Sequence, residues 1–228
     1  YDLPFGCPGW LEGVLHVDRF LRAAGGGHAL VVGTETLSRV IDPHDRDGML
    51  YADGAGAVVL KAEEGDPRVG ILGHRTRSDA VDHHALLRMG PSCRPDAPAD
   101  RLYLKMDGRK VYEYAVRKVP GLVRETLDEA GVGLHEVDML LAHQANAKMN
   151  RAILRRLLRD EGLDEVGPGM IPMTISWLGN SSVATVPTLF DLVRRGEVEG
   201  HAIDSGDVLV FASVGAGMNV NAMLYRCP

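Results

Sequence analysis

The sequence has few cysteines, few aromatic residues and no long apolar run. Three of its 228 residues are cysteine, and Cys7, Cys93 and Cys227 show neither Cys-x-x-Cys nor zinc-ligand spacing. An odd number of thiols argues against a disulfide framework, so we expect a reducing, cytoplasmic environment and no bound metal. No apolar segment approaches the roughly 20 residues of a membrane span. No signal peptide is recognisable at the N-terminus.

The overall composition narrows the class of protein further. Hydrophobic residues make up 45% of the chain and charged residues 25%, which excludes a disordered or fibrous protein. The net charge of −6 argues against general nucleic-acid binding, although it allows a local basic patch. The chain also begins without Met, and Tyr1 to Phe5 resembles the end of a strand. We therefore expect a fragment whose apolar edges are exposed.

Reactive side chains stand at three joints between a strand or loop and a helix, the position where α/β folds carry their chemistry. The three are Cys7, before a helix over about 10–24; His143, between a strand over 137–142 and a helix over about 147–161; and Asn180, before a helix over about 182–194. A thiol, an imidazole and an amide are thus candidates for one site. Taken singly, His143 could equally be a core histidine and Asn180 a helix cap.

Cys7 lies where a helix would favour its ionised form. Pro8 suits the start of a helix, where unpaired N–H groups and the helix dipole stabilise a thiolate. On this basis we expect a lower pKa for Cys7 than for Cys93 or Cys227. The alternative is that Cys7 is a small buried core residue.

The remaining pattern predicts an α/β protein. Gly54 and Gly56 precede a strand rather than a helix, so we interpret them as sites of close backbone packing and not as a phosphate loop. Pro120 should bend the longest helix. The further elements are a buried parallel strand over 29–33, strands near 69–75 and 170–176, the helix over 108–130, and strands over 207–213 and 218–226.

Two parts of the chain are alike. The run 29–33 followed by 54–60 corresponds in order and character to 208–212 followed by 215–224. Each pair comes after a strand, a reactive residue and a helix, which indicates internal duplication. We expect the units carrying Cys7 and His143 to be related by a pseudo-twofold axis, so that the two side chains meet.

The ordered motifs together resemble the β-ketoacyl-acyl-carrier-protein synthase III family of thiolase-fold condensing enzymes. They are Cys7-Pro-Gly, Asp42-Pro-His-Asp-Arg46, Asp53-Gly-Ala-Gly-Ala57, His143-Gln-Ala-Asn146 and Gly179-Asn-Ser-Ser182. The resemblance covers nearly the whole chain. It implies an α/β fold of two pseudo-repeated βα halves, with mixed five-stranded sheets and buried helices. Residues 1–100 would be the remainder of an incomplete N-terminal half, and residues 101–228 the C-terminal half.

The resemblance also implies roles for the three reactive residues. Cys7 would accept an acyl group from acyl-CoA, and His143 and Asn180 would complete the catalytic triad. Backbone N–H groups of Cys7 and Ala216 could hold the thioester oxyanion. The turn departs from the commoner glycine-rich form of the family through Ala216 and Met218, which affects its expected shape rather than the reaction.

Substrate and partner contacts follow from the same resemblance. Arg46, Gly108, Arg109 and Asn146 correspond to positions near the CoA nucleotide and the pantetheine tunnel, although the family more often has Asn where Arg109 stands. Both arginines could equally be solvated, and Asn146 a helix cap. Lys148, Arg151 and Arg155, with Arg159, form a basic stripe that could bind the acidic carrier protein or be an ordinary solvated face.

We therefore expect an acyltransferase that condenses an acyl group on Cys7 with malonyl-carrier protein in the initiation of fatty-acid synthesis. It would use acyl-CoA and malonyl-carrier protein as substrates with no cofactor, and form a homodimer when complete. One alternative is a specialised-metabolite acyltransferase or condensing enzyme of the same fold. Another is a non-catalytic partner or inactive fragment.

Overall fold

The computed structural model describes residues 1–98, 100–163 and 169–228. Its helices are α1 (Gly9–Ala23), α2 (Ala80–His83), α3 (Gly108–Ala130), α4 (Ala147–Asp160), α5 (Ile175–Leu178) and α6 (Thr185–Arg194). Its strands are β1 (Gly27–Thr36), β2 (Asp53–Ala62), β3 (Gly70–Ser78), β4 (Leu87–Gly90), β5 (Tyr103–Met106), β6 (Met139–Ala142), β7 (Val208–Gly215) and β8 (Asn219–Arg226). Short 3₁₀ turns include Arg46–Leu50, Ser182–Ala184 and Ala216–Met218.

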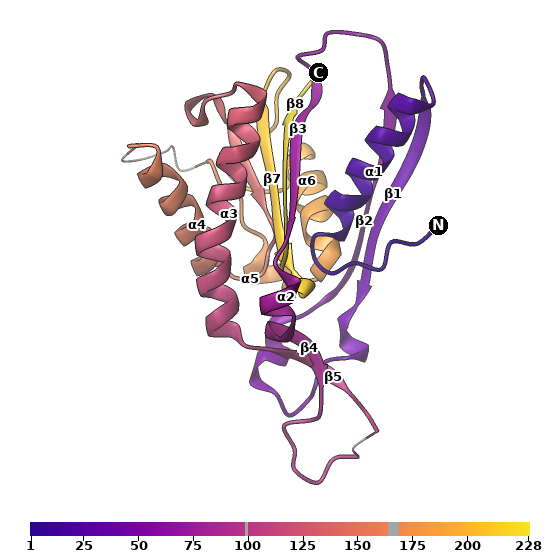
Figure 1. Cartoon of the computed structure of the whole chain (residues 1–228), viewed down its shortest axis with the longest axis vertical. Coiled ribbons are helices and arrows are strands. Elements are labelled where there is room, and N and C mark those ends of the chain that lie inside the picture. The colour runs from indigo at the N-terminus through magenta and orange to yellow at the C-terminus, as the bar shows by residue number, and fades with distance from the viewer. Residues whose placement is uncertain (99, 164–168) are drawn as a thin grey trace.

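The elements form layers around a four-stranded sheet with the order β3-β8-β7-β6. Helices α3 and α4 cover one face of this sheet, and α1 and α6 lie between its other face and the β1–β2 pair (Figure 1). Strand β6 runs parallel to β7, whereas β8 is antiparallel to both β7 and β3. The thiolase-like architecture expected from the sequence is thus present in the described residues, with two helices buried between sheets.

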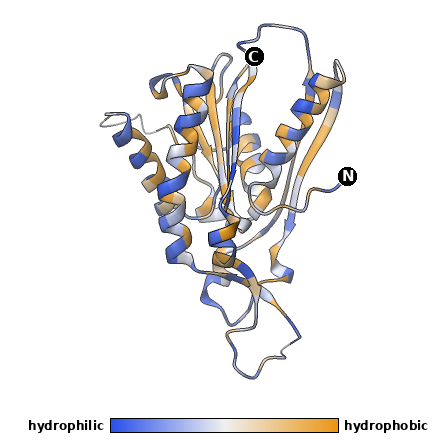
Figure 2. Ribbon diagram, in the orientation of Figure 1, coloured by the Kyte–Doolittle hydropathy of each residue, from blue (hydrophilic) through white to orange (hydrophobic). Residues whose placement is uncertain are grey.

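Strand β7 shows how the sequence builds this arrangement. All eight of its residues are buried, because helices cover both faces of the sheet. Alternate side chains divide between two cores: Val210 packs with α3 and α4, while Phe211 packs with α1 and α6. A continuous apolar run is therefore required here. Figure 2 shows the resulting hydrophobic colour of the central strands.

The predicted helix over 108–130 is confirmed, with the same bounds in α3. The side chain of Asp107 caps its first turn by accepting the Lys110 N–H group. Gly131 ends it with a φ of 67°, a left-handed conformation that favours glycine. Pro120 lies inside the helix, on its buried face.

The prediction of a buried parallel strand over 29–33 was wrong. Strand β1 pairs antiparallel with β2, and its residues alternate between buried and exposed. Val31 and Gly33 face α1, whereas Leu30 and Val32 point outward. An uninterrupted apolar run is typical of a strand covered on both faces. In the described residues helices cover only one face of this pair.

The prediction of a strand near 170–176 was also wrong. The Leu140 N–H group donates to the Met170 carbonyl at 2.7 Å, but the chain does not continue that ladder and instead enters α5. The described part of this sheet consequently has four strands rather than the expected five. The division of the chain at residue 100 stays a prediction; β3, which precedes residue 100, pairs with β8 of the C-terminal sheet.

The predicted internal duplication has a structural counterpart. Helix α1 leads into the antiparallel pair β1–β2, as α6 leads into β7–β8. The counterpart of Cys7 at the start of α1 is therefore the segment Asn180–Ser182 before α6, and not His143. The two helices meet where they begin, since Ser182 contacts Cys7.

The outward face of the β1–β2 pair is apolar and exposed. Leu30 and Val59 are cross-strand partners and are 64% and 67% exposed. Val32 and Phe20 are also exposed nearby in the sequence. Adjacent exposed apolar side chains on a two-stranded sheet favour association with other polypeptide.

Replacing Leu30 with Lys and Val59 with Glu should reduce self-association of the chain. The new charges form a cross-strand pair on a solvent-facing surface, so the unfolding temperature should change by no more than about 2 °C. Sedimentation velocity over a concentration series measures the effect. A wild-type chain that stays monomeric at every concentration, or a double variant that associates as strongly as the wild type, would show that this face does not drive association.

Candidate active site

The segment from Gly179 to Thr185 forms the centre of the candidate site. Gly179 has a φ of 69°, and a β-carbon there would lie 3.1 Å from that of Ala52. The Asn180 N–H group donates to Leu50, and the Asn180 carbonyl accepts from Ala52. These two bonds attach the segment to the chain that enters β2.

Cys7 lies one residue before Pro8, the N-cap of α1, and next to the segment before α6. Its Sγ atom is 3.4 Å from the Ser182 hydroxyl. The turn after β7 covers it from the other side, because a β-carbon on Gly215 would lie 2.8 Å from that of Cys7. Ala216 follows this contact, and a β-carbon on Gly6 would approach its backbone nitrogen to 3.0 Å. Small residues at 6 and 215 are needed for this close approach.

Burial controls the ionisation of Cys7. It raises the pKa of the thiol to about 11, although hydrogen bonds from Ser182 and from the backbone act in the opposite direction. The expectation of a depressed pKa was therefore wrong. The start of α1 does favour a thiolate, but removal of the sulfur from water has the larger effect. Burial raises the pKa of Cys227 to about 11 as well.

His143 follows β6 and is 3% exposed. Its N–H group donates to Ala212 at 2.8 Å, and its carbonyl accepts from the Asn150 amide at 3.0 Å. Its Nδ1 atom lies 2.6 Å from the Thr185 hydroxyl. Burial lowers the pKa of His143 to about 4, so the imidazole is neutral at physiological pH and carries a single N–H.

Asn180 is buried, and the oxygen of its side-chain amide already accepts a hydrogen bond. Its Oδ1 atom accepts the Ser182 N–H group at 2.9 Å. Within the described residues its Nδ2 atom has no protein acceptor, so the amide retains donors for a ligand. Cys7 and His143 each contact the same short segment, through Ser182 and Thr185 respectively. The structure thus brings the three predicted residues together.

Two family models match this chain. One, for 3-oxoacyl-[acyl-carrier-protein] synthase III, matches residues 1–80, and the other, for the C-terminal part of that enzyme, matches residues 127–227. Among curated proteins, a β-ketoacyl-[acyl-carrier-protein] synthase III from Erythrobacter litoralis is 36% identical, over 99% of this chain and 67% of its own length. The chain belongs to the 3-oxoacyl-[acyl-carrier-protein] synthase III family.

Other members of the synthase III family are similar in sequence and structure. The enzyme from Lactobacillus delbrueckii subsp. bulgaricus is 33% identical over 99% of this chain and 67% of its own length. The crystal structure of the Pseudomonas aeruginosa enzyme matches with a TM-score of 0.84 and 29% identity, covering all of this chain and 67% of that one. The chain thus spans about two thirds of the length of these relatives.

The predicted CoA-side residues of this family member occupy two neighbouring segments. Arg46 is exposed and begins the 3₁₀ turn that leads to Tyr51. Gly108 begins α3, and a β-carbon there would lie 3.8 Å from the Asp47 carboxylate, so the two segments adjoin. Arg109 is exposed and pairs with Glu113 at 2.9 Å, as a solvated helix residue does. Contact of these residues with CoA stays a prediction.

The predicted site residues that follow His143 belong to helix α4 or to its N-terminal cap. Asn146 is the N-cap of α4, where its side chain accepts the Met149 N–H group. This confirms the capping alternative, and a substrate contact stays a prediction. Lys148, Arg151 and Arg155 are exposed on α4, with Arg159, while the opposite face packs into the core. The amphipathic pattern is confirmed, and carrier-protein binding stays a prediction.

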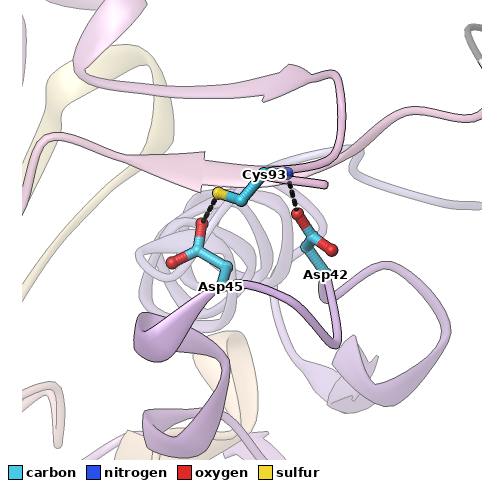
Figure 3. Close-up of side chains that lie close together, drawn as sticks. All are labelled: Asp42, Asp45 and Cys93. Carbon is cyan, nitrogen blue, oxygen red and sulfur yellow. Dashed lines mark hydrogen bonds between the residues drawn. The ribbon is translucent and has the colours of Figure 1, made fainter. Parts of the chain in front are cut away.

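Asp42, Asp45 and Cys93 form a cluster of possible metal ligands beside the Arg46 turn (Figure 3). Lys105 already supplies a cation there: its Nζ atom is 2.6 Å from Asp42 and 2.9 Å from Asp45. Although burial alone raises the pKa of Asp42, Lys105 and several other donors hold it well below its usual range. The cluster therefore fixes the β4–β5 hairpin to the Arg46 turn.

Sequence reasoning did not identify three polar residues that support the site. Ser182 and Thr185 make the contacts described above, and the buried Gln144 side chain accepts the Thr174 and Ile175 N–H groups. Ser182 and Gln144 lie inside the quoted motifs, but their partners are far away in the sequence.

In the described part of the chain, no helix is long and apolar enough to cross a membrane.

The raised pKa of Cys7 predicts how the rate of its alkylation depends on pH. Between pH 7 and pH 10 the rate of Cys7 modification by iodoacetamide should rise about tenfold per pH unit, because the thiolate fraction stays small below a pKa of about 11. Peptide mass spectrometry measures it. A plateau reached by pH 8 would show instead that the resting thiol ionises readily.

Proposed function

We propose that this chain carries out the acyl transfer and decarboxylative condensation of a synthase III, with Cys7 as nucleophile and His143 and Asn180 as donors. The observation that carries the proposal is the convergence of these three residues on the segment from Asn180 to Thr185. Family membership supports the same activity. The substrates are acyl-CoA and malonyl-carrier protein, with no cofactor.

In the first half-reaction the Cys7 sulfur attacks the carbonyl carbon of acyl-CoA. A bond forms between that carbon and the sulfur, the bond to the CoA sulfur breaks, and CoA takes up the proton that Cys7 loses. In the tetrahedral intermediate between these two events, the former carbonyl oxygen carries a negative charge. We assign its stabilisation to the N–H groups of Cys7 and Ala216, because the turn at Gly215 packs directly on Cys7.

In the second half-reaction the malonyl group loses CO₂ and becomes an enolate, which attacks the acyl carbon on Cys7. A carbon–carbon bond forms, the bond from that carbon to the Cys7 sulfur breaks, and the released thiolate takes up a proton from solvent. The enolate oxygen accepts hydrogen bonds from the Asn180 amide and from Nε2 of His143. A neutral His143 can donate from Nε2 only if Nδ1 is unprotonated. The Thr185 hydroxyl lies 2.6 Å from Nδ1 and donates to the Ser182 carbonyl at 3.0 Å. We propose that it turns its single proton from that carbonyl to Nδ1 when the enolate forms, and the carbonyl then keeps the Thr185 backbone N–H.

A related condensing activity is the second candidate. The priming β-ketosynthase of the R1128 polyketide pathway matches with a TM-score of 0.83 and 29% identity, over all of this chain and 65% of that one. The same chemistry would then start polyketide rather than fatty-acid synthesis. In either case we propose a cytoplasmic homodimer. The two candidate activities differ in the acyl group that Cys7 accepts.

Replacing His143 or Asn180 with Ala should separate the two half-reactions. Each variant should retain acylation of Cys7 and lose about 10²–10³-fold in malonyl decarboxylation, because the lost donor serves only the enolate. Radiolabelled acyl-CoA measures the first step and release of CO₂ the second. A Cys7→Ala control should abolish acylation. If His143→Ala abolished acylation as completely as Cys7→Ala, the proposed division of roles would be wrong.

Reversing the charge of Lys148 and Arg151 to Glu should weaken the step that uses malonyl-carrier protein. Both are exposed on the first turns of α4, five and eight residues after His143. We expect the association rate at low salt to fall about tenfold or more and to lose its salt dependence. Acylation from CoA should change little.

A matched control replaces Arg22 and Lys61 with Glu, because both are exposed cations outside the candidate site. Stopped-flow kinetics over a range of salt concentrations compare the two double variants. Equal losses in both half-reactions, or equal effects of the two double variants, would identify the α4 stripe as an ordinary solvated face.

A further inference from the structure

Ser182 has an unusual backbone conformation for its residue type. Its φ angle is 51°, in the left-handed region that favours glycine. The side chain is nevertheless a serine, and it is 6% exposed. A β-carbon at this conformation is unfavourable, so a serine at this position points to a use for its side chain.

The contacts of Ser182 provide that use. Its hydroxyl lies 3.4 Å from Cys7 Sγ, and its N–H group donates to Asn180 Oδ1 at 2.9 Å. Its carbonyl lies 3.0 Å from the Thr185 hydroxyl, which in turn contacts Nδ1 of His143. One residue thereby connects the nucleophile and both proposed enolate donors, and only the Cys7 contact uses the side chain.

The left-handed backbone conformation of Ser182 allows the residue to make all of these contacts at once. It begins the 3₁₀ turn that leads into α6, while the Ser182 hydroxyl is directed back toward the start of α1. The neighbouring Ser181 is equally buried but faces β2, where a β-carbon on Gly54 would lie 2.8 Å from that of Ser181. Two adjacent serines thus have separate roles, one packing on β2 and one contacting Cys7.

We propose that Ser182 is a positioning residue for acyl transfer, whose hydroxyl donates a hydrogen bond to the Cys7 thiolate as it forms. The proposal rests on the proposed function and adds a residue to its first half-reaction. Among the described side chains, Ser182 is the one that hydrogen-bonds to Cys7. This bond partly offsets the effect of burial on the pKa of the thiol.

The test compares Ser182→Gly with the control Ser181→Ala. Glycine suits a φ of 51°, so Ser182→Gly removes the hydroxyl while keeping the turn and its backbone contacts. Its unfolding temperature should equal or exceed that of the wild type. Ser182→Ala removes the hydroxyl without relaxing the backbone and serves as a second variant.

Both Ser182 variants should acylate Cys7 about ten- to a hundredfold more slowly at neutral pH, through kcat rather than KM for acyl-CoA. The iodoacetamide profile of Cys7 should move to higher pH, because a donor to the thiolate is lost. Release of CO₂ from malonyl-carrier protein by protein already acylated on Cys7 should stay within about twofold of wild type, because the enolate forms before the Cys7 thiolate is expelled. Ser181→Ala should leave the alkylation profile in place.

Wild-type acylation rates and an unchanged alkylation profile in both Ser182 variants would overturn the proposal. Equal losses in acylation and in release of CO₂ by acylated protein would also overturn it, because they would indicate a structural role alone. The alkylation profile separates this proposal from the proposed function. If wild-type protein fails to accept an acyl group, the function fails, while the shift in thiol reactivity still decides the role of Ser182.

Discussion

Removal of the catalytic groups from water is the constraint on which the site depends. Helices α1 and α6 begin side by side between two sheets, where His143 is buried and Cys7 is half-buried under the turn at Gly215. Burial raises the pKa of the thiol and lowers that of the imidazole, so both groups rest in their neutral forms. The same low-polarity surroundings strengthen hydrogen bonds to an oxyanion or enolate when one forms. The site thus avoids charge at rest and stabilises it during reaction.

The surrounding loops are held by polar contacts of long sequence separation. Lys105 joins the β4–β5 hairpin to Asp42 and Asp45, which precede the Arg46 turn. The chain leaves that turn through Tyr51 and Ala52, which pair with Asn180. The proposed CoA-side segments and the catalytic centre are therefore part of one connected structure.

Local patterns in the sequence predicted most of the fold and the three reactive residues. Helix α3 was predicted to the residue because its cap, periodicity and terminal glycine agree, and the glycines at 54 and 56 do permit close packing on the segment that begins α6. The direction of β1 was not predictable, because an apolar run does not specify whether its neighbour is parallel or antiparallel. The pKa of Cys7 was missed for a similar reason. Desolvation depends on Gly215 and Ser182, which are distant in the sequence. The positive φ of Ser182 likewise has no local signature.

The central claim is that Cys7 carries the acyl group between the two half-reactions, and mass spectrometry of the Cys7 peptide tests it most directly. After incubation with acyl-CoA the peptide should gain the mass of one acyl group, while the peptides containing Cys93 and Cys227 stay unchanged. Adding malonyl-carrier protein should then remove that mass and yield β-ketoacyl-carrier protein. An unmodified Cys7 peptide, or an acyl group on Cys7 that malonyl-carrier protein does not discharge, would contradict the account.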